Sequence, residues 1–317
     1  MSRNIEDAVV LCRSIEQNIN RVIVGKESTI RLIMIALTAG GHLLIEDVPG
    51  IGKTTMVRAL ARSLDLQFSR IQFTPDVMPS DVTGYNIFNP TTGEFEFRPG
   101  AIMTQILLAD EINRTSPKTQ SALLEAMQEN QVTVDRKTYR LPQPFIVLAT
   151  QNPIEQQGTY ILPEAQLDRF MMQITLGYPS FEEEFNILDR FSEDEPLDDL
   201  LPVASSDDVI WLQETARQVY VADPIKHYIS HLAQKTRSHR DIELGVSPRA
   251  TLMLLQAAKA RALLEGRGFV VPDDVQQLFQ PVLRHRLLVR AEGRVQGVDS
   301  AQILDTILRQ VPVPARQ

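Results

Sequence analysis

One short glycine-rich segment constrains the fold of this chain more than any other feature of the sequence. Residues 50–54 read Gly-Ile-Gly-Lys-Thr; they follow an apolar run at 43–45 and precede a segment, 56–64, with apolar residues at helical spacing. Strand, glycine-rich turn and helix in this order form a phosphate-binding loop. Glycines let backbone N–H groups wrap around a polyphosphate, and the helix N-terminus adds positive potential. The segment therefore predicts an α/β nucleotide-binding domain.

The side chains of this loop indicate how it would bind ATP. We expect Lys53 to reach the β- and γ-phosphates and the Thr54 hydroxyl to hold Mg²⁺. Asp47 departs from the usual pattern GxxxxGK[ST], which has glycine at that position. A plain glycine-rich turn with a solvated lysine is the alternative interpretation. The predicted nucleotide-contacting residues are Val24, Gly25, Pro49, Gly50, Ile51, Gly52, Lys53, Thr54 and Thr55.

A second motif narrows the chemistry. Residues 105–111, Gln-Ile-Leu-Leu-Ala-Asp-Glu, form an apolar run that ends in two acids, which is typical of a strand buried on both faces. Asp110 could bind the Mg²⁺ held by Thr54, and Glu111 could polarise a water for in-line attack on the γ-phosphate. Paired acids can also form a solvated turn, but their position after a phosphate-binding loop favours the metal site.

Composition limits the classes of partner. The formal net charge of −8 and the pI of about 5.3 make general attraction to nucleic acid or anionic membranes unexpected. Cys12 is the only cysteine, which excludes an intrachain disulfide and fits a reducing compartment. Its apolar neighbours suggest that it lies in the core. No apolar segment has the length of a signal peptide or a membrane span. We therefore expect a cytoplasmic protein.

Strand and helix patterns divide the chain. Strands are expected at 67–73, 145–150 and 172–176, and they alternate with helices, which predicts a parallel sheet with ligands at the carboxyl ends of its strands. After an acidic, proline-broken stretch only helical patterns are found. The 317 residues suffice for two cores. The predicted organisation is an αβα core at 1–178, an acidic linker at 179–205 and a small all-α lid at 206–317.

Two segments interrupt the alternation. Residues 85–97 and 132–141 each read as strand, turn and strand. They are either passive surface hairpins or binding elements, since binding residues concentrate in exposed loops. Phe95, Phe97 and Tyr139 would offer apolar or stacking contacts, or would pack the hairpins.

Three polar residues could complete the site. Asn152 ends the strand at 145–150 and could orient the attacking water, although asparagine is also a common turn former. Arg169 precedes the last strand; it is either a surface ion-pair partner or an arginine finger for a neighbouring subunit. Arg249 begins a helix that Ser247 caps. A cation there opposes the helix dipole unless an anion lies opposite, so Arg249 is a candidate nucleotide sensor.

A histidine pair superficially suggests zinc. His227 and His231 have i, i+4 spacing, but the residues between them lack the glutamate of the HExxH motif, and no third ligand is apparent. We interpret them as surface or packing residues.

Together these motifs resemble those of the MoxR family of AAA+ ATPases. The resemblance covers nearly the whole chain, and family members often carry an acid at the position of Asp47. The matching strings are EDVPG at 46–50, FTPDVMPSDVTG at 73–84, LADEINR at 108–114, ATQNP at 149–153 and GVSPRA at 245–250.

The resemblance implies an αβα core with a helical lid, a helix-2 insert hairpin, a pre-sensor hairpin and ring assembly, commonly hexameric, with ATP between subunits. It implies a chaperone-like remodeller, often paired with von Willebrand factor A domain proteins, in cofactor insertion or complex maturation. By motif, Asp110 binds Mg²⁺, Glu111 is the base, Asn152 is sensor 1, Arg169 is the finger and Arg249 is sensor 2, in cis or in trans. Arg114 is a second candidate trans-acting arginine.

Two other functions remain open at this stage. A DNA motor is possible because related hairpin-bearing AAA+ proteins move nucleic acid, but the acidity of the chain disfavours it. A P-loop kinase for a small acceptor would leave Arg169 and Arg249 unexplained. A GTPase is disfavoured because the guanine-reading NKxD string is absent.

Overall fold

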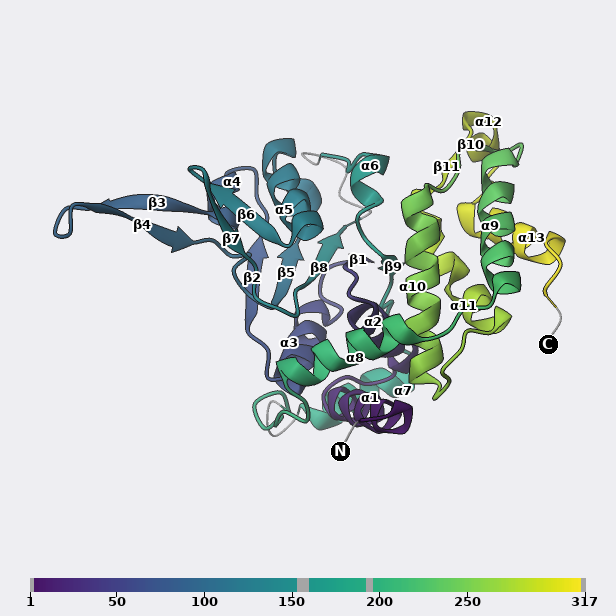
Figure 1. Cartoon of the computed structure of the whole chain (residues 1–317), viewed down its shortest axis with the longest axis horizontal. Helices are drawn as coiled ribbons and strands as arrows, with labels where there is room; N and C mark the ends of the chain where they lie inside the picture. The colour runs from purple at the N-terminus through teal and green to yellow at the C-terminus, as the bar shows by residue number, and fades with distance from the viewer. Residues whose placement is uncertain (1–2, 153–159, 192–195, 315–317) are drawn as a thin grey trace.

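The computed structural model describes residues 3–152, 160–191 and 196–314. Pro153 of the ATQNP string and residues 192–195 of the expected linker lie outside the described residues. Figure 1 shows a sheet flanked by helices on one side of the molecule and a group of C-terminal helices beside it.

A five-stranded parallel sheet forms the centre of the N-terminal part. Its strand order is β2-β5-β8-β1-β9, and every neighbouring pair is parallel. The strands β1, β5 and β8 are consequently adjacent, and the loops that follow them meet at one edge of the sheet. The strands are β1 (Leu43–Glu46), β2 (Phe68–Gln72), β5 (Ile106–Asp110), β8 (Ile146–Gln151) and β9 (Met172–Ile174).

Each face of the sheet packs against a separate layer of helices. Leu108 of β5 belongs to a core with α1 (Ile5–Asn20), α2 (Glu27–Ala39) and α3 (Lys53–Ser63). Leu107 and Ala109 belong to a second core with α5 (Pro117–Glu129). Successive side chains of a strand point to opposite faces, so a continuous apolar run fills both layers. The remaining short elements on this side are α4 (Pro79–Thr83), η1 (Ile112–Arg114) and α6 (Glu164–Leu167).

Both expected hairpins are present. The first consists of β3 (Gly84–Asn89) and β4 (Glu94–Pro99) and projects away from the body (Figure 1), and the second of β6 (Gln131–Val134) and β7 (Lys137–Arg140). Phe97 stacks on Tyr139 with ring centroids 3.9 Å apart, so these two aromatics join the hairpins to each other. Phe95 is 72% exposed, with its ring edge against Phe88.

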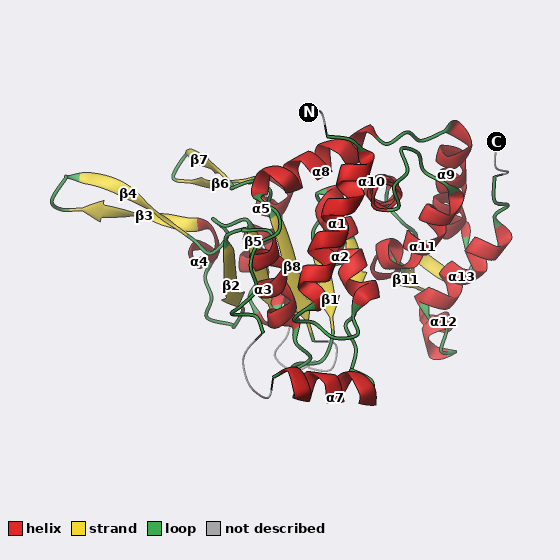
Figure 2. Ribbon diagram, turned by 90° about the horizontal axis from the view of Figure 1, so that it is seen from below, coloured by secondary structure: helices red, strands yellow, loops and turns green. Residues whose placement is uncertain are grey.

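Helix α7 (Phe181–Arg190) occupies part of the segment for which we expected a linker. Ser180 caps it and forms a capping box with Glu183, and three glutamates of its first turn lie at the positive end of the helix dipole. The range expected to be a linker therefore contains a capped helix, which lies before the acidic, proline-broken stretch at 192–199. Figure 2 shows α7 at the edge of the molecule, apart from the other helices.

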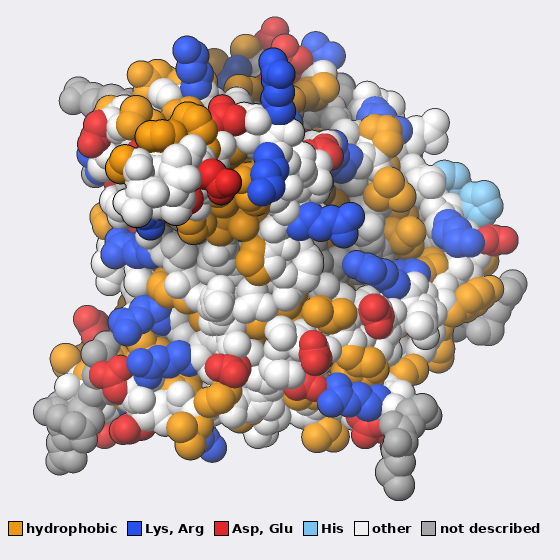
Figure 3. All heavy atoms as spheres, turned by 60° about the vertical axis from the view of Figure 1, so that its left-hand side comes forward, with side chains coloured by type: hydrophobic (Ala, Val, Ile, Leu, Met, Phe, Trp, Pro, Cys, Tyr) orange, Lys and Arg blue, Asp and Glu red, His pale blue; other side chains and the backbone are white. Residues whose placement is uncertain are grey.

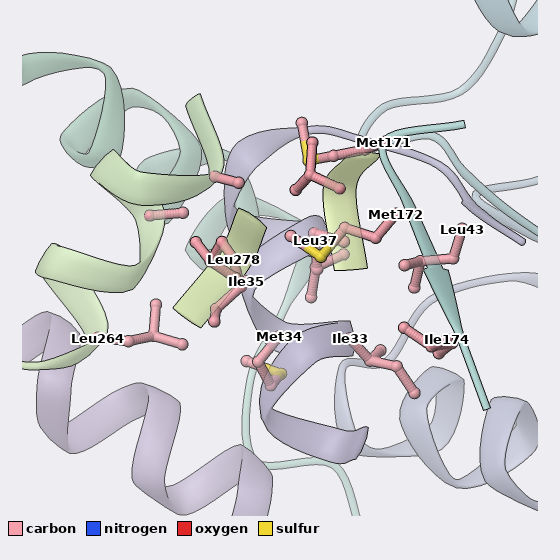
Figure 4. Packing of buried hydrophobic residues seen from close by; sticks show 14 of the residues in the cluster. Ile33, Met34, Ile35, Leu37, Leu43, Met171, Met172, Ile174, Leu264 and Leu278 are labelled. Atoms are coloured by element: carbon pink, nitrogen blue, oxygen red, sulfur yellow. The ribbon is translucent and has the colours of Figure 1, made fainter. Parts of the chain in front are cut away.

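The C-terminal part is a helical lid with one two-stranded sheet. Its helices α8 and α10 contact α2, so that lid and core share a hydrophobic interior, part of which Figure 4 shows around Met34, Leu37, Met172 and Leu278. No described helix is both long and apolar enough to span a bilayer. The elements are α8 (Ser206–Gln218), α9 (Asp223–Ser238), β10 (Ile242–Leu244), α10 (Pro248–Leu264), α11 (Pro272–Leu283), η2 (Arg284–Arg286), β11 (Leu288–Val289), α12 (Ala291–Val295) and α13 (Ser300–Gln310).

Candidate functional site

The phosphate-binding loop joins β1 to α3 in an open conformation. Gly50 and Gly52 have φ of +84° and +88°, values that side-chain-bearing residues rarely adopt, and a Cβ on either would meet nothing within 4 Å. Helix α3 begins at Lys53, whose Nζ donates to the carbonyl oxygens of Asp47 and Val48 at 3.0 and 2.9 Å. The space over the glycines, beside a helix N-terminus, suits an anion.

Asp47 has a structural task that explains its departure from the glycine pattern. Its carboxylate is buried and accepts hydrogen bonds from the backbone N–H groups of Leu176 and Gly177, the latter at 3.1 Å. It thereby joins the start of the phosphate-binding loop to the chain that follows β9. A glycine at this position could not make this connection.

The two acids lie at the carboxyl end of β5, and the Thr150 hydroxyl connects them. Its Oγ1 donates to Oδ1 of Asp110 at 2.5 Å and accepts from the backbone N–H of Glu111 at 2.8 Å. The other oxygen of Asp110, Oδ2, pairs with Arg70 of β2 at 2.7 Å. Glu111 has φ of +56°, so its backbone holds an unfavourable left-handed conformation beside these contacts.

The Glu111 carboxylate is also held from two sides. Its Oε2 accepts from Nε2 of Gln72 at 2.7 Å and from Nη1 of Arg114 at 2.9 Å. Arg114, which we considered as a trans-acting residue, thus contacts an acid of its own chain. Neither Gln72 nor Arg70 was among the residues expected from the sequence.

A cavity of about 460 Å³ lies between the phosphate-binding loop, the 22–26 segment and α7. Much of its lining is apolar, which suits a planar base. Of the expected residues, Val24, Pro49, Gly50, Ile51, Gly52 and Thr55 line it. Gly25 adjoins it with φ of +67°, and the Glu183 carboxyl group of α7 occupies the space that a Cβ would need. The residues that α7 and its flanks contribute, which the sequence analysis missed, are Leu176, Tyr178, Pro179, Glu184, Ile187, Leu188 and Phe191.

Two side chains at this edge of the sheet carry oxygen atoms of the kind that Mg²⁺ prefers. The residues that would hold the metal are Thr54, next to Lys53 at the start of α3, and Asp110. Mg²⁺ is commonly bound by one or two protein oxygens together with phosphate oxygens. Among the residues that the structure describes, no cluster of three or more His, Cys, Asp or Glu side chains suits a metal, and His227 and His231 lie on α9 without such a cluster.

Asn152 follows β8 and is buried. Because β8 lies between β5 and β1, the end of this strand separates the acidic pair from the phosphate-binding loop. Asn152 therefore follows the strand that lies between the two halves of the candidate site.

Arg169 and Arg249 lie elsewhere. Arg169 precedes β9, and Met171 N–H donates to the carbonyl oxygen of His42 at 2.7 Å, beside the amino end of β1. The phosphate-binding loop follows the opposite, carboxyl end of that strand. Ser247, the cap of α10, donates to Oδ2 of Asp168 at 2.8 Å, which brings the start of the helix bearing Arg249 to the segment bearing Arg169. The structure thus brings the segments that bear the two arginines together, on the side of β1 opposite the phosphate-binding loop.

Comparison with known proteins gives concordant matches. The model of the ATPase family associated with various cellular activities (AAA) matches residues 42–172, and that of the AAA lid domain matches residues 234–307. The chain is 52% identical to the protein YeaC of Bacillus subtilis, covering 98% of both chains. It is 39% identical to Chaperone MoxR1 of Mycobacterium tuberculosis, covering 93% of this chain and 80% of the relative. The crystal structure of a putative ATPase from Cytophaga hutchinsonii superposes with a TM-score of 0.92 at 39% identity, covering 98% of this chain and 97% of the other.

Proposed function

Because this chain belongs to the MoxR family of AAA+ ATPases, we propose that it hydrolyses ATP with Mg²⁺ at the phosphate-binding loop and uses the energy to remodel client proteins. One observation carries the proposal. An open glycine loop with an adjoining apolar cavity lies at the same edge of the sheet as two acids held in place by hydrogen bonds, with the end of β8 between them.

Each residue at the loop has one role in this proposal. Lys53 leaves the carbonyl groups of its own loop to contact the β- and γ-phosphates, and Thr54 and Asp110 would hold the metal. Bound Mg²⁺ would neutralise charge on the phosphates. Glu111 accepts a proton from the attacking water, and Asn152 orients that water. Gln72 and Arg114 both donate to Oε2 of Glu111 and so hold the carboxylate that accepts this proton.

The active site is proposed to be shared between subunits of a ring, commonly a hexamer. The segments that bear Arg169 and Arg249 meet near the amino end of β1, whereas the phosphate-binding loop follows its carboxyl end, and this supports a role in another subunit. In a second copy of the chain the two arginines would stabilise charge on the transferring phosphoryl group. An arginine finger contributes about 10³–10⁵ in rate.

Mixing two inactive variants tests the shared site. Arg169→Ala removes the finger and Glu111→Gln removes the base, so each pure variant should bind ATP but hydrolyse it slowly. An interface that combines the Glu111 of one variant with the Arg169 of the other is intact, and activity should return on mixing. Absence of recovery in a demonstrated mixed assembly would contradict the sharing of the site.

We further propose that the β3–β4 hairpin contacts the client. Figure 3 views the molecule from the hairpin side and shows hydrophobic side chains gathered where the hairpin projects. Tyr85, Ile87, Phe88 and Phe95 of this hairpin are 44–72% exposed, unlike an apolar cluster that serves packing alone. Deleting the turn at 91–94 should leave ATP binding intact and impair client action. Unchanged client action would make the hairpin a passive insert.

The client is proposed to be a protein complex under maturation or cofactor insertion, with a von Willebrand factor A domain protein as a candidate partner. The proposed location is the cytoplasm, which the single, buried Cys12 supports. A Glu111→Gln variant held in its ATP state is the tool to recover that client for identification.

A further inference from the structure

A buried arginine of the lid holds the segment that carries Arg169. The side chain of Arg286, in η2, is 2% exposed. Its guanidinium donates to Oδ1 of Asp168 at 2.8 Å and to the carbonyl oxygen of Met171 at 3.2 Å, and it also contacts the carbonyl oxygen of Phe170. The donors of one side chain are thus distributed over residues 168–171, on both sides of Arg169.

Asp168 extends this contact to α10. One carboxylate oxygen accepts from Arg286 and the other accepts from the Ser247 hydroxyl at 2.8 Å. The same hydroxyl accepts from the backbone N–H of Ala250 at 3.1 Å and so caps the helix. Arg249 lies between Ser247 and Ala250, on the first turn of α10. Asp168 therefore connects the backbone next to Arg169 with the turn that carries Arg249.

Stability of the fold does not by itself explain why the charged Arg286 is buried here. Burial, opposed by the Asp168 carboxylate and aided by the nearby charge of Arg249, lowers the pKa of Arg286 to about 10. Replacing buried ion pairs with apolar side chains of similar volume is often neutral or stabilising. What the charged group provides, and an apolar one cannot, is a fixed geometry between three segments.

The neighbouring Arg169 lacks such an anchor at its Nε within the described part of the chain. Nε of Arg169 is buried and has no hydrogen-bond partner among the described residues, and Arg249 is exposed. The side chains of both cations are therefore positioned mainly by their backbone segments. Those two segments are the ones that Asp168 and Arg286 connect.

We propose that Arg286 and Asp168 are positioning residues that fix Arg169 and Arg249 relative to each other, so that both cations are presented together to the nucleotide phosphates of a second copy of the chain. The inference rests on the proposed sharing of the active site. It assigns the pair no contact with the nucleotide.

Two variants weaken the connection to different degrees. Arg286→Met keeps apolar bulk and removes the charge. Ser247→Ala removes only the hydroxyl and is the milder change. Ser205→Ala is the matched control, because Ser205 also caps a lid helix, α8, but hydrogen-bonds Asp208 instead of Asp168. ATP binding within about threefold of wild type shows that a variant retains a folded core.

Arg286→Met should lower kcat by about tenfold or more, because misplacement by about 1 Å can cost 10²-fold. Ser247→Ala should lower kcat in the same direction, and Ser205→Ala should not. When mixed with Glu111→Gln subunits, Arg286→Met should regain activity as Arg169→Ala does, since its own loop and Glu111 are intact. A purely structural defect would remain in every site that contains an Arg286→Met subunit.

The outcomes separate the inference from the proposed function. Wild-type kcat in both Arg286→Met and Ser247→Ala overturns the inference, and so does loss of activity that mixing fails to restore while Arg169→Ala is restored. Failure of Arg169→Ala itself to recover overturns the shared site, and the inference with it.

Discussion

The Thr150 hydroxyl gives the sharpest single-residue prediction for the ATPase site. It donates to Asp110 and accepts from the backbone N–H of Glu111, and the side chain is 1% exposed. Thr150→Val preserves the shape of the side chain and removes both hydrogen bonds. Any loss of activity can therefore be assigned to the hydroxyl.

The magnitude follows from these contacts. A buried N–H left without an acceptor costs about 1–3 kcal/mol of stability. The left-handed backbone of Glu111 costs about 1–2 kcal/mol and persists only while its surroundings hold it. Losing an outer partner of a metal-binding group typically lowers activity by about 10–100-fold. We therefore expect kcat to fall within that range while ATP binding, which depends on Lys53 and the glycine loop, changes little.

The assay is ATP hydrolysis at saturating Mg²⁺–ATP, together with urea unfolding and ATP binding. Thr150→Ser is the control, because serine keeps the hydroxyl and loses only a methyl group. The serine variant should retain most of the activity that the valine variant loses. A Thr150→Val protein with wild-type kcat would refute the view that the hydroxyl positions the acids.

Three further predictions concern stability and reactivity. Asp274 is fully buried and pairs with Arg261 and Arg267, so Asp274→Asn should lower the free energy of unfolding in urea by about 3–5 kcal/mol. A decrease no larger than that of the exposed Asp273→Asn would contradict this. Burial lowers the pKa of His42 to about 4, so the native state binds fewer protons than the unfolded state below the ordinary histidine pKa. The free energy of unfolding should therefore fall by about 3 kcal/mol, through this group, as the pH drops from about 6.5 to 4. His42→Gln should reduce proton uptake on unfolding near pH 5 by almost one, and an unchanged pH slope would count against the assignment. Burial raises the pKa of the Cys12 thiol to about 12, so a disulfide reagent should label it only on unfolding, and rapid labelling of the native protein would disprove its burial.

Sequence reasoning succeeded where the signal is local. The apolar runs at β1, β5 and β8 and the glycines at 50 and 52 each specify their conformation through neighbouring residues, and the predicted parallel α/β core with a helical lid is confirmed. The hairpin patterns are likewise confirmed. The burial of Cys12 followed from its apolar neighbours.

It failed where the structure depends on tertiary contacts or on competing local signals. The linker expected at 179–205 rested on the acidic, proline-broken stretch at 192–199, whereas α7 begins earlier in that range, where Ser180 and Glu183 form a capping box. Thr150 and Gln72 reach the acids from adjacent strands, and no local pattern reveals such a contact. Asp47 departs from the glycine pattern because it binds the N–H groups of Leu176 and Gly177, which follow β9 about 130 residues away in the chain.

The direct test of the central claim is to identify the nucleotide that stays bound after incubation with Mg²⁺ and γ-labelled ATP. We predict that wild-type protein retains ADP and releases labelled phosphate, whereas Glu111→Gln retains intact ATP. The base is needed for the attack on the γ-phosphate, while Lys53 and the loop amides suffice for binding. Phosphate release by Glu111→Gln at the wild-type rate would contradict the assignment of Glu111 and of the site built around it.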